Sequence, residues 1–280
     1  MRRILIAGCG YVGAATADLF HATGWAVEGW THSQDSAAEL ASKPYLVRAV
    51  DISGNEVAGD FDVVIHCASS GGGGAEGYRR IYLEGARNLL EKLRPHGFIF
   101  TSSTSVYAQS GGEWVDETSA TEPVHETGKI LRETEALVRQ SGGVVARLAG
   151  IYGPGRSALL RKFLAGEARL DGDGSRFLNQ VHRDDIANAL VRLAELPDEG
   201  IVNVVDDEPN TQRDAYEWLA ARLGRPLPPT ADRPQKRKRG MSNKRVRNAR
   251  LRSLGWEPRF PNFASGMEDS VLPAAGKVTR

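Results

Sequence analysis

The chain has 280 residues, of which 41% are hydrophobic and 25% charged, so it has the composition of an ordinary globular protein with a sizeable core. Its formal net charge of +1 argues against a global attraction to nucleic acid or to an anionic membrane. No apolar stretch approaches the length needed to span a membrane.

The stretch Ile4–Gly13 predicts a strand, a tight glycine turn and a helix. An apolar run ends at Gly8, and from Val12 the apolar positions take helical spacing. Gly8 permits the turn, Gly10 leaves room for a pyrophosphate beside the backbone, and Gly13 lets the helix pack closely on its strand. The helix start also offers free N–H groups and the positive end of its dipole to a phosphate. We therefore predict a dinucleotide site formed by Gly8, Gly10, Tyr11, Val12 and Gly13.

A second strand is predicted over Trp25–Trp30, with Thr31, His32 and Ser33 at its carboxyl end. A carboxylate at this position would bind the adenine ribose hydroxyls and favour NAD, whereas small polar residues leave space for the 2′-phosphate of NADP. Because these three residues include no carboxylate, NADP is favoured over NAD. The same residues are equally compatible with an exposed polar turn that binds nothing.

Strands over 46–50 and 61–68 continue an alternation of strands and helices that predicts a parallel sheet. The carboxyl end of the strand over 61–68 supplies further residues expected along the cofactor, which are Cys67, Ala68 and Ser69. Asp51 and Ile52 follow the strand over 46–50, and their expected cofactor contact rests on the family resemblance given below. The side chains of His66 and Cys67 are interpreted mainly as packing groups. The glycine run Gly71–Gly74 fits either a loop along the cofactor or a hairpin without a ligand.

A long amphipathic helix is predicted over 78–93 and a buried strand over Gly97–Phe100. The carboxyl end of this strand carries the hydroxyl cluster Thr101–Tyr107, at the edge where open α/β sheets bind their ligands. These hydroxyls predict a ligand site, and capping of the strand end is the simpler alternative.

A helix over Gly128–Gln140 and a strand over Val144–Leu148 follow, after which the regular alternation loosens. We predict a dinucleotide-binding domain over 1–153, to which 177–196 returns, and a smaller substrate-binding lobe over 154–280. Within the returning segment, Asp184 or Asp185 is expected to cap the helix that follows.

A basic run lies between Arg233 and Arg252, with ten Lys or Arg residues and no acidic residue. Such a run is typical of a solvated loop, and an anion site for a substrate phosphate is the functional alternative. Nucleic-acid binding is disfavoured because the run has no interleaved aromatic residues.

The two cysteines, Cys9 and Cys67, have neither the spacing of metal ligands nor a disulfide framework, so no metal site is expected. The basic start of the chain breaks at Gly8 and Gly10, too early for a secretory signal. Both features predict a cytoplasmic protein.

These motifs together resemble the extended and atypical short-chain dehydrogenase/reductases, the NAD(P)-dependent epimerase/dehydratase family, over nearly the whole chain. The matching motifs are Gly8–Gly13, Asp51–Ile52, Thr101–Tyr107, Lys129 with Glu133, Arg147–Gly155, Val181–Ala187 and Asn203–Asp207. The resemblance implies an α/β fold with a Rossmann-type doubly wound parallel sheet of seven strands and a smaller carboxyl-terminal substrate lobe. It also implies a nicotinamide cofactor, a small-molecule substrate such as a sugar or nucleotide sugar and, by analogy, a homodimer.

Chemistry in this family rests on a Ser or Thr, a Tyr, and a Lys four residues after the Tyr. The resemblance places the hydroxyl at Ser103 and the lysine at Lys129, but His125 stands where the tyrosine is expected, and none of the seven tyrosines has a Lys four residues later. The resemblance therefore gives Ser103, His125 and Lys129 as catalytic candidates, with Lys129 also binding the cofactor ribose. Glu113–Glu117 and Tyr152 are then expected to line the substrate pocket.

Histidine at position 125 changes the expected proton chemistry. The pKa of a tyrosine is about 10, and it must fall by roughly three units for the side chain to act as a base at neutral pH, which corresponds to a free energy of about 4 kcal/mol. The pKa of a histidine is about 6.5, so its side chain is already mostly neutral at neutral pH. We therefore expect His125 to accept a proton from an alcohol but to be a poor acid for carbonyl reduction.

Two functions remain open at this point. The first is an NAD(P)-dependent oxidoreductase or epimerase/dehydratase-like enzyme acting on a hydroxyl-bearing small molecule. The second is a catalytically impaired NAD(P)-binding protein that acts as a redox sensor or interaction partner. Loss of the tyrosine with retention of Ser103 and Lys129 fits either function.

Overall fold

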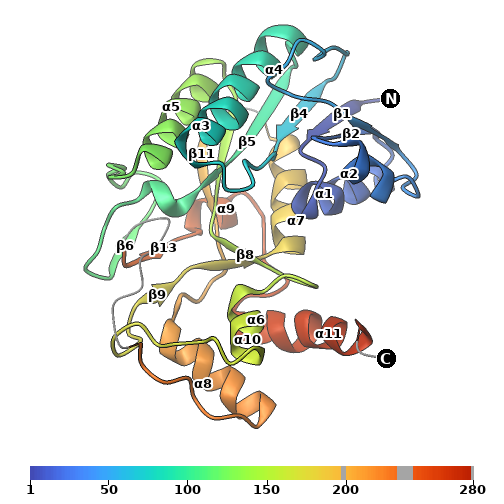
Figure 1. Cartoon of the computed structure of the whole chain (residues 1–280). Coiled ribbons are helices and arrows are strands. Elements are labelled where there is room, and N and C mark those ends of the chain that lie inside the picture. The colour runs from blue at the N-terminus through green and yellow to red at the C-terminus, as the bar shows by residue number, and fades with distance from the viewer. Residues whose placement is uncertain (197–199, 232–241, 279–280) are drawn as a thin grey trace. The chain divides into compact units, whose positions relative to one another are not determined.

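The computed structural model describes residues 1–196, 200–231 and 242–278, which belong to two compact units (Figure 1). The first, called here the sheet unit, comprises 1–106, 121–147 and 186–202. The second, called the carboxyl-terminal unit, comprises 107–120, 148–185 and 203–280. No helix within the described residues is long and apolar enough to cross a membrane.

The units divide the chain at positions other than residue 153. Strand β8 (Gly150–Tyr152) pairs in parallel with β10 (Gln180–His182), which takes the residues after Leu148 out of the large sheet. The return to the sheet unit, predicted over 177–196, spans 186–202. The segment 107–120 also belongs to the carboxyl-terminal unit.

A seven-stranded parallel sheet forms the centre of the first unit, as predicted, and its strand order is β11-β7-β5-β4-β1-β2-β3. Its strands are β1 (Arg3–Ala7), β2 (Ala26–Thr31), β3 (Leu46–Ala49), β4 (Val63–His66), β5 (Gly97–Ser103), β7 (Val144–Leu148) and β11 (Ile201–Val204). The chain leaves β1 toward β2 and β3 and returns on its other side at β4. In doubly wound sheets this reversal of strand order marks the crevice where nucleotides bind.

Helices cover both faces of the sheet, and Figure 1 shows α4 and α5 on one side with α1 and α7 on the other. Because both faces are covered, Ile4, Leu5 and Ile6 of β1 are all fully buried. The helix predicted over 78–93 is interrupted by a π-helical stretch. The helical elements of this part of the chain are α1 (Tyr11–Ala22), α2 (Gln34–Glu39), α3 (Gly74–Tyr78), the π-helical η1 (Arg79–Glu84), α4 (Gly85–Leu93), the short 3-10 turn η2 (Thr104–Val106), α5 (Glu126–Gln140) and α7 (Arg183–Ala194).

The carboxyl-terminal unit packs short helices around an aromatic core that includes Tyr152, Phe163, Tyr216 and Phe263. Its helical elements are α6 (Ala158–Leu164), α8 (Gln212–Leu223), α9 (Ala249–Ser253), α10 (Phe263–Gly266), the π-helical η3 (Met267–Val271) and α11 (Leu272–Val278). Its strands β6 (Glu113–Val115) and β13 (Lys244–Val246) pair in parallel, and β9 (Phe177–Leu178) pairs antiparallel with β12 (Asn210–Thr211).

The expected N-cap at Asp184 or Asp185 is wrong, because α7 begins at Arg183 and both acids lie in its first turn. The buried carboxylate of Asp185 instead accepts the backbone N–H groups of Arg259 (2.7 Å) and Phe260 (3.1 Å). Burial raises the pKa of Asp185 to about 6. The carboxylate therefore fastens a distant loop of the same unit rather than its own helix.

Candidate functional site

The glycine turn between β1 and α1 has the geometry of a phosphate cradle. Gly8 has a φ of +102°, and a Cβ there would lie 2.2 Å from the backbone nitrogen of Ala68. A Cβ on Gly13 would lie 2.3 Å from the carbonyl oxygen of Gly8. A Cβ on Gly10, by contrast, would meet nothing within 4 Å. Gly8 and Gly13 are thus required by the protein itself, whereas Gly10 keeps a space open at the start of α1 that fits a pyrophosphate.

Tyr11 and Val12 form the first turn of α1, where Val12 is buried and Tyr11 is partly exposed. The backbone N–H groups of Gly8 and Cys9 both donate to Trp30 O, at 2.9 and 2.7 Å. The turn is therefore fixed to β2. Gly10 N donates to Gly8 O (2.7 Å), which closes the loop tightly.

The end of β2 presents no acidic side chain. Thr31 is buried, and its hydroxyl donates to Ser33 O (3.1 Å), so it does not belong to an exposed turn. Ser33 caps α2 by accepting the Ser36 N–H (3.2 Å), and His32 is exposed. Of the three residues predicted here, His32 and Ser33 are the ones open to solvent.

Asp51 is held in a fixed orientation at the end of β3. Its Oδ1 accepts from the backbone N–H (3.0 Å) and hydroxyl (2.7 Å) of Ser53, and its Oδ2 forms an ion pair with Arg80. Burial alone would raise the pKa of Asp51, but these bonds to Ser53 and Arg80 hold it below its ordinary value. The neighbouring Ile52 is buried, and a Cβ on Gly85 of α4 would lie 2.8 Å from its Cδ1.

The end of β4 packs under the glycine turn. His66 is fully buried, with Nε2 3.1 Å from Ile81 O, and burial lowers its pKa to about 4. The Cys67 thiol donates to Gly8 O (3.3 Å), and burial raises its pKa. Both side chains are packing groups, as interpreted from the sequence. Ala68 contributes backbone beside Gly8, and Ser69 is exposed.

Ser103 is the last residue of β5 and is partly exposed. Its Oγ accepts the backbone N–H of Ser105 (3.2 Å), which leaves the hydroxyl proton free to be donated to a ligand. Its neighbour Ser102 is buried and points elsewhere, donating to Glu135 (2.6 Å). Within the hydroxyl cluster, Ser102 is thus tied to α5, whereas Ser103 is partly exposed at the end of the strand.

His125 and Lys129 lie at the start of α5, where His125 is the N-cap residue. The His125 side chain makes no capping hydrogen bond and is exposed. The Lys129 ammonium is 61% exposed and lies 3.8 Å from a Glu126 carboxylate oxygen. Both groups can reach a ligand without breaking a buried interaction.

The most buried ionic cluster among the described residues escaped sequence reasoning. Arg147 of β7 donates from Nε (3.0 Å) and Nη2 (2.7 Å) to the two carboxylate oxygens of Glu135 on α5, and both residues are at most 1% exposed. A signal was present in the sequence, because a lone arginine within the apolar strand Val144–Leu148 needs a buried acidic partner. Nothing in the sequence, however, identifies which glutamate supplies it.

The carboxyl-terminal unit contains a second polar cluster, around Arg176 and Lys244. The backbone N–H of Phe177 donates to Asn243 Oδ1 (2.9 Å), which holds the two segments side by side. Lys244 Nζ donates to Tyr107 O and Ser242 Oγ, both at 3.0 Å, while the buried Arg176 Nε has no partner within the described residues. Burial, and then the charge of Arg176, lower the pKa of Lys244 to about 8.

Two sequence expectations in this unit need correction or restriction. Tyr152 does not line a pocket: it is 1% exposed, its hydroxyl donates to Asn262 O (3.2 Å), and it packs in the core. Residues 233–241 of the basic run lie outside the described residues. In the described remainder, the guanidinium carbons of Arg245 and Arg247 lie over the ring of Trp114 of β6, at 4.9 and 5.0 Å from the ring centroid. The run therefore does stack on an aromatic ring, supplied from another strand.

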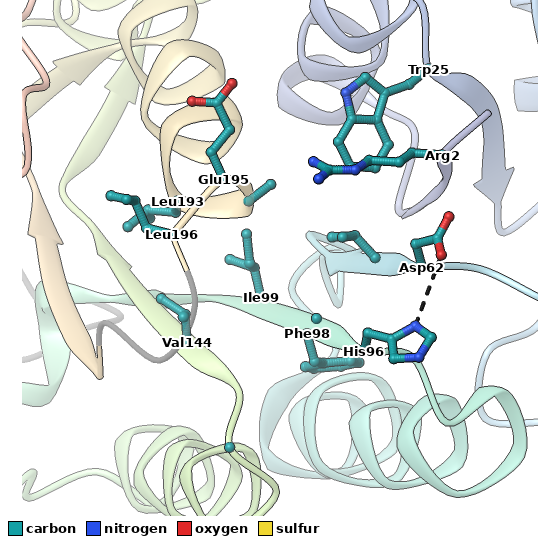
Figure 2. A pocket seen from close by; sticks show the side chains of 14 residues that line it. Arg2, Trp25, Asp62, His96, Phe98, Ile99, Val144, Leu193, Glu195 and Leu196 are labelled. Atoms are coloured by element: carbon teal, nitrogen blue, oxygen red, sulfur yellow. Dashed lines mark ion pairs between the residues drawn. The ribbon is translucent and has the colours of Figure 1, made fainter.

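A cavity of about 400 Å³ opens at the other edge of the sheet, where the parallel strands begin. Figure 2 shows Arg2 and Trp25 on one side, Leu193 and Glu195 on the other, and Phe98 among the apolar groups. None of the predicted site residues lines it. The candidate cofactor site is therefore the carboxyl edge, not this cavity.

The family assignment follows from a comparison with known sequences. The model of the NAD-dependent epimerase/dehydratase family matches residues 4–205, from the first strand to the end of the sheet. The chain belongs to this family. Its members are NAD-dependent epimerases and dehydratases, and the glycine turn is built as such a cofactor requires.

Proteins with similar sequences or structures match most or nearly all of the chain. Protein YeeZ of Escherichia coli K12 is 32% identical over 241 residues, which cover 80% of this chain and 85% of YeeZ. A protein from Methylobacillus flagellatus, provisionally named an NAD-dependent epimerase/dehydratase, has a TM-score of 0.80 at 28% identity and covers 98% of this chain and 99% of its own. The UDP-glucuronic acid 4-epimerase of Bacillus cereus, in complex with UDP-glucuronic acid and NAD, has a TM-score of 0.81 over 99% of each chain. At 18% identity, the last likeness concerns the fold alone.

Proposed function

We propose that the protein is an NADP(H)-dependent oxidoreductase or epimerase that acts on a hydroxyl group of a phosphate-bearing small molecule such as a nucleotide sugar. The observation that carries the proposal is the glycine turn. The protein's own packing leaves no room for a Cβ on Gly8 or Gly13, but it leaves open space beside Gly10. A dinucleotide whose pyrophosphate lies against this turn would supply an oxidised nicotinamide that accepts a hydride from the substrate carbon.

The chain's own residues then handle the substrate oxygen. The Ser103 hydroxyl, whose oxygen is already occupied by the Ser105 N–H, donates to that oxygen and orients it. His125 accepts the hydroxyl proton, because a neutral imidazole is a competent base at neutral pH. Lys129 binds the ribose hydroxyls of the cofactor. The ammonium of Lys129 lies 3.8 Å from the exposed carboxylate of Glu126.

The preference for NADP is supported by the end of β2, where His32 and Ser33 leave space for a 2′-phosphate. Titration with NADPH and NADH, followed by nucleotide fluorescence, should give tighter binding of NADPH. The matched variant Ser33→Asp keeps a good helix cap but adds a carboxylate, and it should move the preference toward NADH. Equal binding of both nucleotides by both proteins would contradict this assignment.

The anionic character of the substrate is supported by the Arg176 and Lys244 cluster in the carboxyl-terminal unit. A phosphate would satisfy the unpartnered Nε of Arg176 and the partly desolvated ammonium of Lys244. Calorimetric titration with UDP-glucose and UDP-glucuronic acid should show binding that Arg176→Gln weakens at least tenfold. Arg252→Gln is the matched control, because Arg252 is exposed and pairs with Asp207. If both substitutions have the same effect, the cluster is not a phosphate site.

Turnover is tested with the same two nucleotide sugars and a panel of simple sugars and alcohols. Reduction of the nicotinamide, or epimerised product, is expected, with oxidation of an alcohol faster than reduction of the matching ketone. His125→Phe should abolish this turnover while nucleotide binding persists. Tight cofactor binding without turnover on any substrate would favour the alternative of a redox sensor or interaction partner, and absence of nucleotide binding would exclude both functions.

A further inference from the structure

The buried cluster around Glu135 connects three elements of the sheet unit. Its Oε1 accepts from Ser102 Oγ of β5 (2.6 Å) and from Arg147 Nε of β7 (3.0 Å). Its Oε2 accepts from Arg147 Nη2 (2.7 Å) and from Arg132 of its own helix. Four donors therefore satisfy the four acceptor positions of one carboxylate.

The position of this carboxylate relates it to the candidate catalytic residues. Ser102 immediately precedes Ser103 at the end of β5, and Glu135 lies on α5, the helix that begins beside His125 and carries Lys129. The hydrogen bond from Ser102 to Glu135 is thus a direct link between the strand that presents the hydroxyl and the helix that presents the lysine. Charge-assisted bonds of this kind fix both distance and direction.

Stability alone does not account for such a cluster. Removing charges from water is costly, and well-packed apolar residues of similar volume often stabilise a protein as well as a buried ion pair does. The helix already buries Ile130, Leu131 and Val138 against the sheet unit. What apolar packing does not provide is a single fixed register of α5 against the sheet, which the directional bonds from Ser102 of β5 and Arg147 of β7 impose.

We propose that Glu135 is a positioning residue that fixes α5 against the end of β5 and thereby sets where Lys129 meets the cofactor relative to Ser103. This role rests on the proposed function, since it requires that Lys129 bind the nucleotide. Glu135 itself touches neither cofactor nor substrate, because it is fully buried.

A double-mutant cycle on NADPH binding tests the role. We expect Glu135→Gln and Lys129→Met each to weaken NADPH binding about tenfold or more, and the double variant to bind no more weakly than Lys129→Met alone. Such non-additivity means that Glu135 acts through Lys129. Additive losses, or unchanged binding by a folded Glu135→Gln, would overturn the proposal, since a general structural role does not depend on the lysine.

Two further variants keep the test decisive. Glu133→Gln is the matched control, two residues away on the same helix, where an exposed carboxylate pairs with Arg79 at 3.2 Å, and it should leave NADPH binding unchanged. If Glu135→Gln does not fold, Ser102→Ala takes its place in the cycle, because it removes one donor and no charge. Wild-type protein that binds neither NADPH nor NADH would refute the proposed function and this role together, whereas binding with an additive cycle refutes this role alone.

Discussion

The substitution Gly10→Ala separates cofactor binding from folding more cleanly than any other change in the glycine turn. Gly10 has a φ of −100°, and an added Cβ would find nothing within 4 Å. The free protein should therefore keep its stability. The new methyl group would occupy the space left for the pyrophosphate, so NADPH binding should weaken at least 100-fold, a loss of about 2.7 kcal/mol.

Gly13→Ala is the counterpart that affects folding. Its Cβ would lie 2.3 Å from Gly8 O and 3.0 Å from Ile6 Cγ2, both in the packed junction of β1 and α1. Overpacking of this kind costs about 3 kcal/mol, which in a chain of this size lowers the melting temperature by roughly 6–12 °C.

Thermal unfolding and NADPH fluorescence titration, run on both variants and the wild type, check the pair. The expected pattern is a normal melting temperature with lost binding for Gly10→Ala, and a lowered melting temperature for Gly13→Ala. If Gly10→Ala binds NADPH like the wild type, the pyrophosphate does not lie against this turn, and the reasoning from the open Cβ position fails.

Three further predictions concern stability. His66 is buried and neutral with a pKa of about 4, so as the pH falls the unfolded state binds the proton first. About 3 kcal/mol of unfolding free energy should therefore be lost between pH 7 and pH 4. Urea unfolding of His66→Phe should show a loss of unfolding free energy smaller by that amount over the same pH range, and a pH dependence equal to that of the wild type would refute the assignment. Asp185→Asn should lower the unfolding free energy by about 2 kcal/mol, because one of the two backbone donors held by the carboxylate is left unpaired, whereas Asp184→Asn, at a partly exposed position, should cost less. Thr211→Ala removes the capping box of α8 and should cost about 1 kcal/mol, so a melting temperature equal to that of the wild type would contradict the cap.

The sequence predicted the sheet and the cofactor turn because both depend on local patterns. The change from strand to helical spacing at Gly8–Gly13 has one steric interpretation, and the structure gives Gly8 and Gly13 the contacts that this interpretation requires. The membership of Thr31 in the strand was less predictable. Its hydroxyl is held by backbone carbonyls of Ser33 and Arg48, and no periodicity reveals such partners.

The residues that sequence reasoning missed owe their importance to partners distant in the chain. Glu135 is one of several glutamates on a helix, and only the approach of Arg147 and Ser102 makes it different from the exposed Glu133. Lys244 was one cation in a basic run interpreted as solvated. Pairing of β13 with β6 buries it beside the carbonyl of Tyr107. Long-range pairing, rather than composition, separates these residues from their neighbours.

The contacts of Lys129 are compatible with the proposed binding of the cofactor ribose. The pair between Lys129 and Glu126 is separated by 3.8 Å and is more than half exposed on both sides, so it contributes at most about 1 kcal/mol. Two ribose hydroxyls can displace such a partner at little cost. Glu135 is the opposite case, because its carboxylate is fully buried and its bonds to Ser102 and Arg147 join buried residues. The start of α5 thus carries the exposed side chains of His125 and Lys129, while Glu135 on the same helix is held by buried bonds to β5 and β7; under the proposed function, this combination pre-organises the helix before the cofactor binds.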